Sequence, residues 1–260
     1  MGEAVEPSLM MFPPADRGDA ADLWLGLGDG EEPSNRDRLI ALTMREVALV
    51  GPASFNTATV CDTLGISYPM VNYYFGNRDG LMAEAAHATY VRYIDKLWRS
   101  VGAAPRDPEE RLRAYLRAHR RLNVEIRGWG AVLNYPIFSA TISSLLEERF
   151  GVDQRRHFEL NAARLARLIL DLWEGRVSDV HYTVDDYERA ELLGQTDLLE
   201  AVAAVSWATL GVAVWNAGRH SPSRGVPELE QLGEDLVEAF VEDIIRSLRI
   251  IRPTEKPPAA

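Results

Sequence analysis

A short stretch of the chain gathers side chains that donate hydrogen bonds yet form no catalytic arrangement. Tyr68, Tyr73 and Tyr74 carry phenol hydroxyls, Asn72 carries an amide, and Arg78 carries a guanidinium. Such donors suit the acceptor atoms on base edges and on phosphates. The chemistry that these residue types indicate is therefore recognition of a nucleic acid by hydrogen bonding, without any bond being made or broken.

Two short helices joined by a tight turn would position these side chains. We expect Thr57 to cap a helix over residues 58–64, and Ser67 to cap a second helix. Gly65 stops the first helix, and Pro69 lies in the first turn of the second, where its missing N–H costs nothing. This arrangement predicts a helix-turn-helix, a motif whose second helix enters the major groove of DNA.

Longer flanking helices must complete the core, because two such short helices bury little apolar surface alone. The pattern predicts one helix over 35–50, capped by Ser34, and another over 79–98. Val71 and Phe75 are the apolar residues that the second short helix would turn towards this core. The motif is therefore expected to be part of a three-helix domain continued by a longer helix.

Residues 65–81 read GISYPMVNYYFGNRDGL, and they resemble the TetR family of bacterial transcriptional regulators. That family's pattern is a threonine-capped helix, G-V-S, a short recognition helix ending in an aromatic-His-Phe run, and then G-S-K-E-x-L. The resemblance covers about residues 34–82 with the spacings kept. Asn72 stands where many members have Tyr, Tyr74 replaces the usual His, and Arg78 replaces the usual Lys.

The resemblance implies an all-α fold with two parts. These are an N-terminal helix-turn-helix three-helix DNA-binding domain, over 34–82, and a larger helical effector-binding and dimerisation domain, over 83–250. Residues 1–33 contain one Arg against eight Asp and Glu and read as an acidic, disordered tail, and 251–260 read as a frayed tail. The alternative for the acidic tail is a segment that folds back on a basic surface and competes with DNA.

The remainder of the chain also reads as helical, with no strand alternation and no repeat. Its apolar spacings predict helices over 108–126, 131–150 with a break at Pro136, 152–174, 185–193, 196–218 and 227–250. Gly151 is predicted to end the second of these helices. On the first of them, His119 and Asn123 share an otherwise apolar face.

Composition excludes several other classes. No apolar run reaches the roughly 18 residues of a membrane span, and the N-terminal sequence lacks a signal-peptide pattern, so we expect a cytoplasmic protein without membrane contact. One cysteine and five histidines without ligand spacing predict no metal and no cofactor. The net charge of −11 disfavours nucleic-acid binding over the whole chain, but residues 36–100 hold seven Lys and Arg against six acids.

Nine residues are candidate DNA contacts. Pro69 and Met70 suit thymine methyls, and Tyr73 suits a base or sugar. Phosphate contacts are expected from Thr57, Tyr74 and Arg78. The alternative is that the tyrosines only pack inside the protein. The full set is Thr57, Ser67, Tyr68, Pro69, Met70, Asn72, Tyr73, Tyr74 and Arg78.

A ligand cavity is the second candidate site. Polar residues on apolar helix faces either find partners inside the protein or line a pocket with nearby aromatic residues. The residues in question are His119, Asn123, Trp129, Tyr135, Phe138, Asn161 and Trp173. The sequence shows no dense cationic cluster, so the expected ligand is apolar or aromatic.

One recognition helix reads only a few base pairs, so specific binding requires two copies about one DNA turn apart. The two C-terminal helices would supply the four-helix interface that the resemblance implies. Its expected contacts are Val202, Val205, Leu210, Val214, Leu236, Phe240 and Ile244. The alternative is that these residues only close the core of one chain.

These observations predict a ligand-responsive transcriptional regulator. In this hypothesis a homodimer represses by binding a palindromic double-stranded DNA operator, and a small, largely apolar or aromatic effector releases it. The alternatives are a helical small-molecule-binding protein, and an activator-type regulator without effector-induced release. An enzyme is not expected, because no nucleophile–base pair, phosphate-binding loop or metal spacing is present in the sequence.

Overall fold

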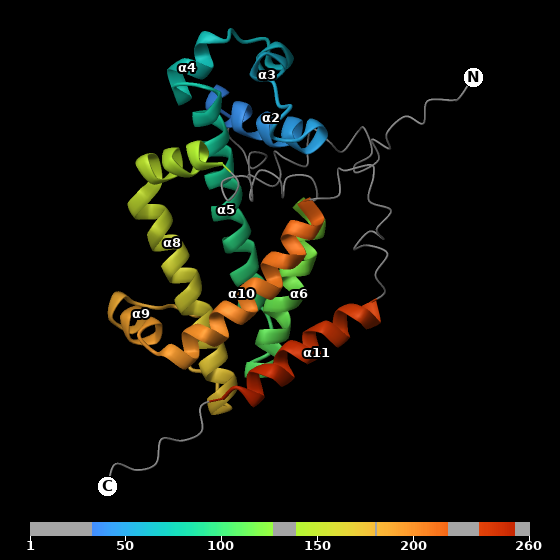
Figure 1. Cartoon of the computed structure of the whole chain (residues 1–260), viewed down its shortest axis with the longest axis vertical. Helices are drawn as coiled ribbons and strands as arrows, with labels where there is room; N and C mark the ends of the chain where they lie inside the picture. The colour runs from blue at the N-terminus through green and yellow to red at the C-terminus, as the bar shows by residue number, and fades with distance from the viewer. Residues whose placement is uncertain (1–32, 127–138, 180, 218–233, 253–260) are drawn as a thin grey trace, which may run out of the picture. The chain divides into compact units, whose positions relative to one another are not determined.

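The computed structural model describes residues 33–126, 139–179, 181–217 and 234–252 (Figure 1). These residues form helices joined by short turns and contain no strand, so the predicted all-α fold class is confirmed. The helices are α2 (Asn35–Val50), α3 (Thr57–Leu64), α4 (Pro69–Phe75), α5 (Arg78–Gly102), α6 (Pro108–Ile126), α8 (Ala140–Glu174), α9 (Asp186–Leu193), α10 (Thr196–Ala217) and α11 (Glu234–Ile250).

The described residues divide into two compact units. The first comprises residues 33–93, 125–126, 139–154 and 213–217, and the remaining described residues form the second. Four helices contribute residues to both units, namely α5, α6, α8 and α10. The domain boundary at residue 82 stays a prediction, and nearly all of the two predicted tails lies outside the described residues.

Side-chain caps define where the helices of the first unit begin. Ser34 caps α2 as predicted, because its Oγ accepts a hydrogen bond of 3.2 Å from the Asp37 amide. The cap of α3 is Asn56, whose Oδ1 accepts from the Ala58 amide at 2.9 Å, so the predicted cap at Thr57 is wrong. Asn is a stronger helix cap than Thr, which accounts for the difference.

The turn between α3 and α4 follows the helix-turn-helix prediction. Gly65 takes a left-handed conformation with φ 65°, which a glycine adopts without a Cβ clash. The α4 helix begins at Pro69, and Tyr68 rather than Ser67 occupies its cap position without a side-chain hydrogen bond. The predicted Ser67 cap is therefore wrong, although the helix lies where it was expected.

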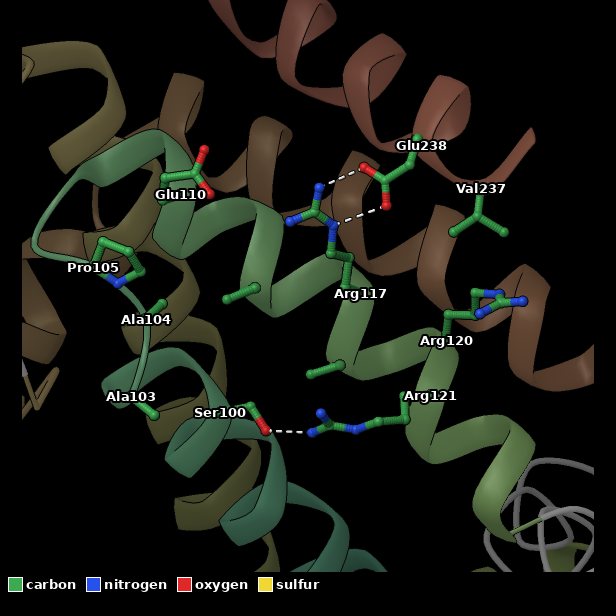
Figure 2. A pocket seen from close by; sticks show the side chains of 12 residues that line it. Ser100, Ala103, Ala104, Pro105, Glu110, Arg117, Arg120, Arg121, Val237 and Glu238 are labelled. Carbon is green, nitrogen blue, oxygen red and sulfur yellow. Dashed lines mark hydrogen bonds and ion pairs between the residues drawn. The ribbon is translucent and has the colours of Figure 1, made fainter. Parts of the chain in front are cut away.

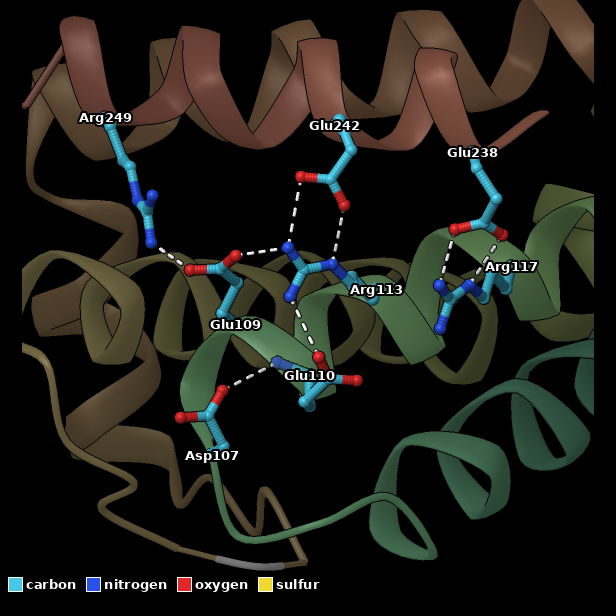
Figure 3. A network of polar contacts seen from close by, with 8 residues as sticks. All are labelled: Asp107, Glu109, Glu110, Arg113, Arg117, Glu238, Glu242 and Arg249. Atoms are coloured by element: carbon cyan, nitrogen blue, oxygen red, sulfur yellow. Dashed lines mark hydrogen bonds and ion pairs between the residues drawn. The ribbon is translucent and has the colours of Figure 1, made fainter. Parts of the chain in front are cut away.

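In the second unit, α6 and α11 lie side by side and are joined by ion pairs (Figure 3). The Arg113 Nε donates to Glu242 at 2.7 Å, and the Arg117 Nε donates to Glu238 at 2.9 Å. Hydrogen bonding from Arg117 lowers the pKa of Glu238. The two ion pairs are one helical turn apart on each helix, so together they fix the register of α11 on α6.

The helix α8 differs from its prediction. It runs without interruption for 35 residues through Gly151, where the sequence indicated an end. A glycine inside a helix costs only about 1 kcal/mol relative to alanine, so packing can override it. One such contact is the stack of Phe150 on His87 of α5, with ring centroids 3.9 Å apart.

Candidate nucleic-acid interface

The helix α4 has two faces of opposite character. Val71 and Phe75 are fully buried in the core of the first unit, as predicted. Pro69, Asn72 and Tyr73 are exposed, and Tyr73 keeps 79% of its surface accessible. Residues three and four apart share one side of a helix, so the exposed residues form a single outward face. We call Tyr68, Pro69, Asn72 and Tyr73 the outer face of α4.

The neighbouring candidates border this face. Ser67 is exposed beside it, whereas Met70 and Tyr74 are half-buried at its edges. The rings of Tyr73 and Tyr74 contact each other edge to face, with centroids 5.1 Å apart. This contact orients Tyr73, which projects into solvent with one phenol hydroxyl at its tip. An exposed tyrosine held by its neighbour can meet a base edge or a sugar at small entropic cost.

Arg78 is occupied inside the first unit. Its Nη2 donates to the Pro52 carbonyl at 2.6 Å, its Nε to the Phe55 carbonyl at 3.3 Å, and its Nη1 to Asp79 at 3.0 Å. The guanidinium also lies 5.3 Å above the ring of Phe55. These contacts join the α2–α3 loop to the start of α5. Arg78 therefore stabilises the helix-turn-helix motif from within, and its guanidinium is occupied by these contacts rather than held ready for a phosphate.

Thr57 is only 4% exposed, and its hydroxyl is buried, so it does not present that group to a phosphate as the sequence suggested. The exposed residue at this helix start is Asn56, which sequence reasoning missed. The signal was present, since an Asn directly before a helix is a strong cap and lies where backbone N–H groups attract anions.

The carboxyl end of α4 is supported by a part of α8 that belongs to the same unit. Arg149 donates to the carbonyl of Phe75, the last residue of α4, and to Glu84 of α5 at 3.3 Å. Glu84 in turn pairs with Arg36 of α2. One carboxylate therefore links α2, α5 and α8 around the base of α4.

The ligand candidates are spread over different surroundings. Asn161 accepts a hydrogen bond from the Trp98 indole at 2.8 Å, and Trp173 donates to the Leu248 carbonyl at 2.8 Å. Both are therefore satisfied internally, which was the alternative interpretation. Asn123 is buried and donates to the His119 carbonyl at 2.7 Å. Trp129, Tyr135 and Phe138 lie outside the described residues.

Among the described candidates, His119 lines a cavity. This cavity, of about 400 Å³, lies between α6, α10 and α11, and its wall includes Thr209 and Phe240. Burial lowers the pKa of His119 to about 3. The imidazole is therefore neutral at physiological pH, and it suits an uncharged ligand in an apolar wall.

A second cavity corrects the expectation that no cationic cluster exists. Arg117, Arg120 and Arg121 line a cavity of about 570 Å³ in the second unit. Along the sequence these arginines look like part of a solvated face. Helical spacing brings them together, and the neighbouring α5 and α11 close the cavity around them.

The predicted dimer residues divide into buried and exposed ones. Val202 and Val205 are buried within the chain and cannot meet a partner in this conformation, so their assignment to the interface is wrong. Leu210, Leu236 and Phe240 are large apolar residues that remain exposed. Ile244 is partly exposed, and the side chain of Val214 lies outside the described residues.

Sequence reasoning missed a large exposed apolar residue of α10. Trp207 of α10 keeps 75% of its surface accessible, and Leu199 is exposed two turns earlier on the same helix. The α10 sequence is apolar on every side, so periodicity could not tell its inner face from its outer one. Within the described residues, no helix is long and apolar enough to cross a membrane, and no group of three His, Cys, Asp or Glu could hold a metal ion.

The fold and the outer face of α4 define a helix-turn-helix protein, and sequence comparison agrees. The HTH-type transcriptional regulator BetI of Stenotrophomonas maltophilia (strain R551-3) is 33% identical over 85 residues, which cover 33% of this chain and 43% of the relative. BetI of Burkholderia cenocepacia (strain HI2424) is 33% identical over 94 residues, which cover 35% of this chain and 46% of the relative.

These relatives are TetR-family regulators and match the N-terminal region, so the resemblance to that family is confirmed there. They are regulators and not enzymes, in agreement with the prediction. The matched region spans less than half the length of each relative. No protein-family model and no solved structure matches the chain.

Proposed function

We propose that this protein is a DNA-binding transcriptional regulator that reads its operator with the outer face of α4. The observation that carries the proposal is the exposure of Tyr68, Pro69, Asn72 and Tyr73 on a short helix whose other side is buried. The ring of Tyr73 is exposed to solvent and so adds no stability to the fold. The base edges in a major groove would offer its hydroxyl hydrogen-bond acceptors. The names of the relatives that match the N-terminal region support the same function.

In this proposal the operator is a palindrome and the protein acts as a homodimer in the cytoplasm. Two recognition helices about 34–36 Å apart meet successive major grooves, which a single copy cannot do. The exposed apolar residues of α10, led by Trp207, support a two-fold interface with a second copy. Leu236 and Phe240 of α11 are exposed too, and because they also line the cavity beside His119, the second copy would cover that cavity.

We further propose that the protein represses its target genes and that a small, largely apolar effector releases it. The cavity of about 400 Å³ beside the neutral His119 supports an uncharged ligand of this kind. Binding of such a ligand weakens DNA binding if the cavity is better formed in a state whose recognition helices are wrongly spaced.

Selection from a random pool of DNA duplexes tests the proposal and identifies the operator sequence in the same experiment. We expect the wild-type chain to enrich an inverted repeat whose half-sites lie about 10 base pairs apart, one helical turn of DNA. The Tyr73→Ala variant should enrich no motif, whereas Tyr187→Ala should behave as the wild type. Tyr187 is a matched control because it is 81% exposed on α9, in the other unit.

A further inference from the structure

The cavity of about 570 Å³ in the second unit lies between the end of α5, the middle of α6 and the start of α11 (Figure 2). Pockets for small organic ligands have volumes of roughly 300–1,000 Å³. Small apolar residues leave the space, namely Ala103, Ala104, Pro105, Ala114, Ala118 and Val237. A ligand of modest size therefore finds apolar walls on the α5–α6 loop and on α6.

The floor of this cavity is fixed in place. Arg111 is buried and donates hydrogen bonds to the Pro105 carbonyl at 3.1 Å and to the Ala104 carbonyl at 3.3 Å. The loop between α5 and α6 is thereby held against the first turn of α6. A preformed wall lowers the cost of ordering that ligand binding would otherwise carry.

Two arginines of α6 keep unused donors at the cavity. Arg121 donates to the Ser100 hydroxyl at 2.7 Å, and within the described part of the chain it forms no ion pair. Arg117 is paired with Glu238 through Nε and Nη2, and its remaining nitrogen points away from that carboxylate (Figure 2). Arg120 adds a third positive charge to the wall.

Within the described residues, the acidic residues of the cavity pair with arginines other than Arg121. Glu238 is engaged by Arg117, and Glu110 pairs with Arg113 at 2.9 Å. The wall therefore carries three positive charges against two negative ones that are already paired. A guanidinium has five N–H donors arranged to fit a carboxylate, so a hydroxyl alone leaves Arg121 incompletely satisfied.

We propose that this cavity binds a small amphiphilic carboxylate. Its carboxylate accepts hydrogen bonds from Arg121 and from the remaining nitrogen of Arg117, which lies one helical turn from Arg121 on the same face of α6. Ser100 holds Arg121 in place, because its oxygen accepts from that guanidinium while its hydroxyl donates to the Lys96 carbonyl at 2.9 Å. Its carbon chain lies against the alanines of the α5–α6 loop and of α6. This cavity shares Arg120 and Val237 with the apolar cavity beside His119, but Arg117 and Arg121 line this one alone of the two. The proposal does not depend on DNA binding.

Calorimetric titration of the full-length protein with octanoate, in the absence of DNA, tests the proposal. We expect octanoate to bind, octan-1-ol to bind about tenfold or more weakly, and octyltrimethylammonium not to bind, because the three share a chain and differ in charge. Equal affinity for octanoate and octan-1-ol, or no octanoate binding at millimolar concentration, would overturn the proposal.

Two variants test separately whether octanoate binding needs the arginine charge and whether it needs the volume of the cavity. Arg121→Gln should weaken octanoate binding about tenfold or more, since it removes a charged donor. Ala114→Leu keeps every charge but fills the cavity, and it should also weaken binding. Arg99→Gln is the control, because Arg99 is exposed on α5 and pairs with Asp95 outside the cavity. Octanoate binding that is unchanged in both folded cavity variants contradicts the site.

Discussion

At the scale of single residues, Arg78 shows how a side chain can matter for DNA binding without touching DNA. It holds the carbonyls of Pro52 and Phe55, and through them the loop that precedes α3. Removing the guanidinium leaves two carbonyls without this donor and loosens the attachment of the α2–α3 loop to the start of α5. The effect of the residue on DNA binding would then pass through the stability of the motif.

We therefore predict that Arg78→Gln lowers the free energy of unfolding by about 1–3 kcal/mol in urea denaturation. The slope of log affinity against log salt should stay unchanged, because no phosphate contact is lost. The exposed Arg99→Gln should change stability by less than about 0.5 kcal/mol. A stable variant whose salt slope falls by about one would instead identify Arg78 as the phosphate ligand that the sequence suggested.

The division of α4 into an inner and an outer face could be predicted from its sequence. Val71 and Phe75 are apolar and four residues apart, so one side of the helix was determined by spacing alone. The burial of Thr57 and the internal bonds of Arg78 depend on the path of the loop over 51–56. Such contacts join residues more than 20 positions apart, and local patterns carry no information about them.

At the scale of helices, Gly80 sets how closely α4 approaches α5. A Cβ built on Gly80 would lie 2.0 Å from the carbonyl oxygen of Phe75, which is a backbone atom and cannot move alone. The turn after α4 therefore requires a glycine at this position for reasons of space.

We predict that Gly80→Ala destabilises the protein by about 1–3 kcal/mol, as expected for overpacking against backbone. Gly211→Ala is the matched control, because a Cβ there meets nothing within 4 Å. That substitution lies within α10 and should stabilise the chain by up to about 1 kcal/mol. Urea denaturation of both variants measures the difference, and equal stabilities would show that the turn tolerates a larger separation.

The sequence predicted where the helices lie more accurately than where they end and which other helices they contact. The predicted helix over 185–193 was close, as α9 begins at Asp186 after a side-chain cap by Asp185. The continuity of α8 through Gly151 was not predictable, because it depends on contacts such as the stack of Phe150 on His87. The arginine-lined cavity depends in the same way on the pairing of α6 with α5 and α11.

At the scale of the whole molecule, binding to a palindromic operator requires two copies of the protein. Trp207, Leu210, Leu236 and Phe240 are exposed and apolar, and Trp is enriched among residues that dominate interface energies. We predict that Trp207→Glu shifts the protein from dimer towards the 29.0 kDa monomer in light scattering after gel filtration. Tyr187→Glu changes an equally exposed aromatic on α9 and should leave the dimer intact. A wild-type protein that is monomeric at micromolar concentration would contradict the interface.

The central claim is that the outer face of α4 reads DNA, and the affinity of three proteins for the enriched duplex tests it most directly. Fluorescence anisotropy should show that Tyr73→Ala binds the enriched duplex about tenfold or more weakly than the wild type, as expected from a lost base contact. Tyr187→Ala should bind as the wild type, and all three should bind a shuffled duplex equally. Equal affinity of Tyr73→Ala and the wild type for the enriched duplex, with both proteins folded, would contradict the claim.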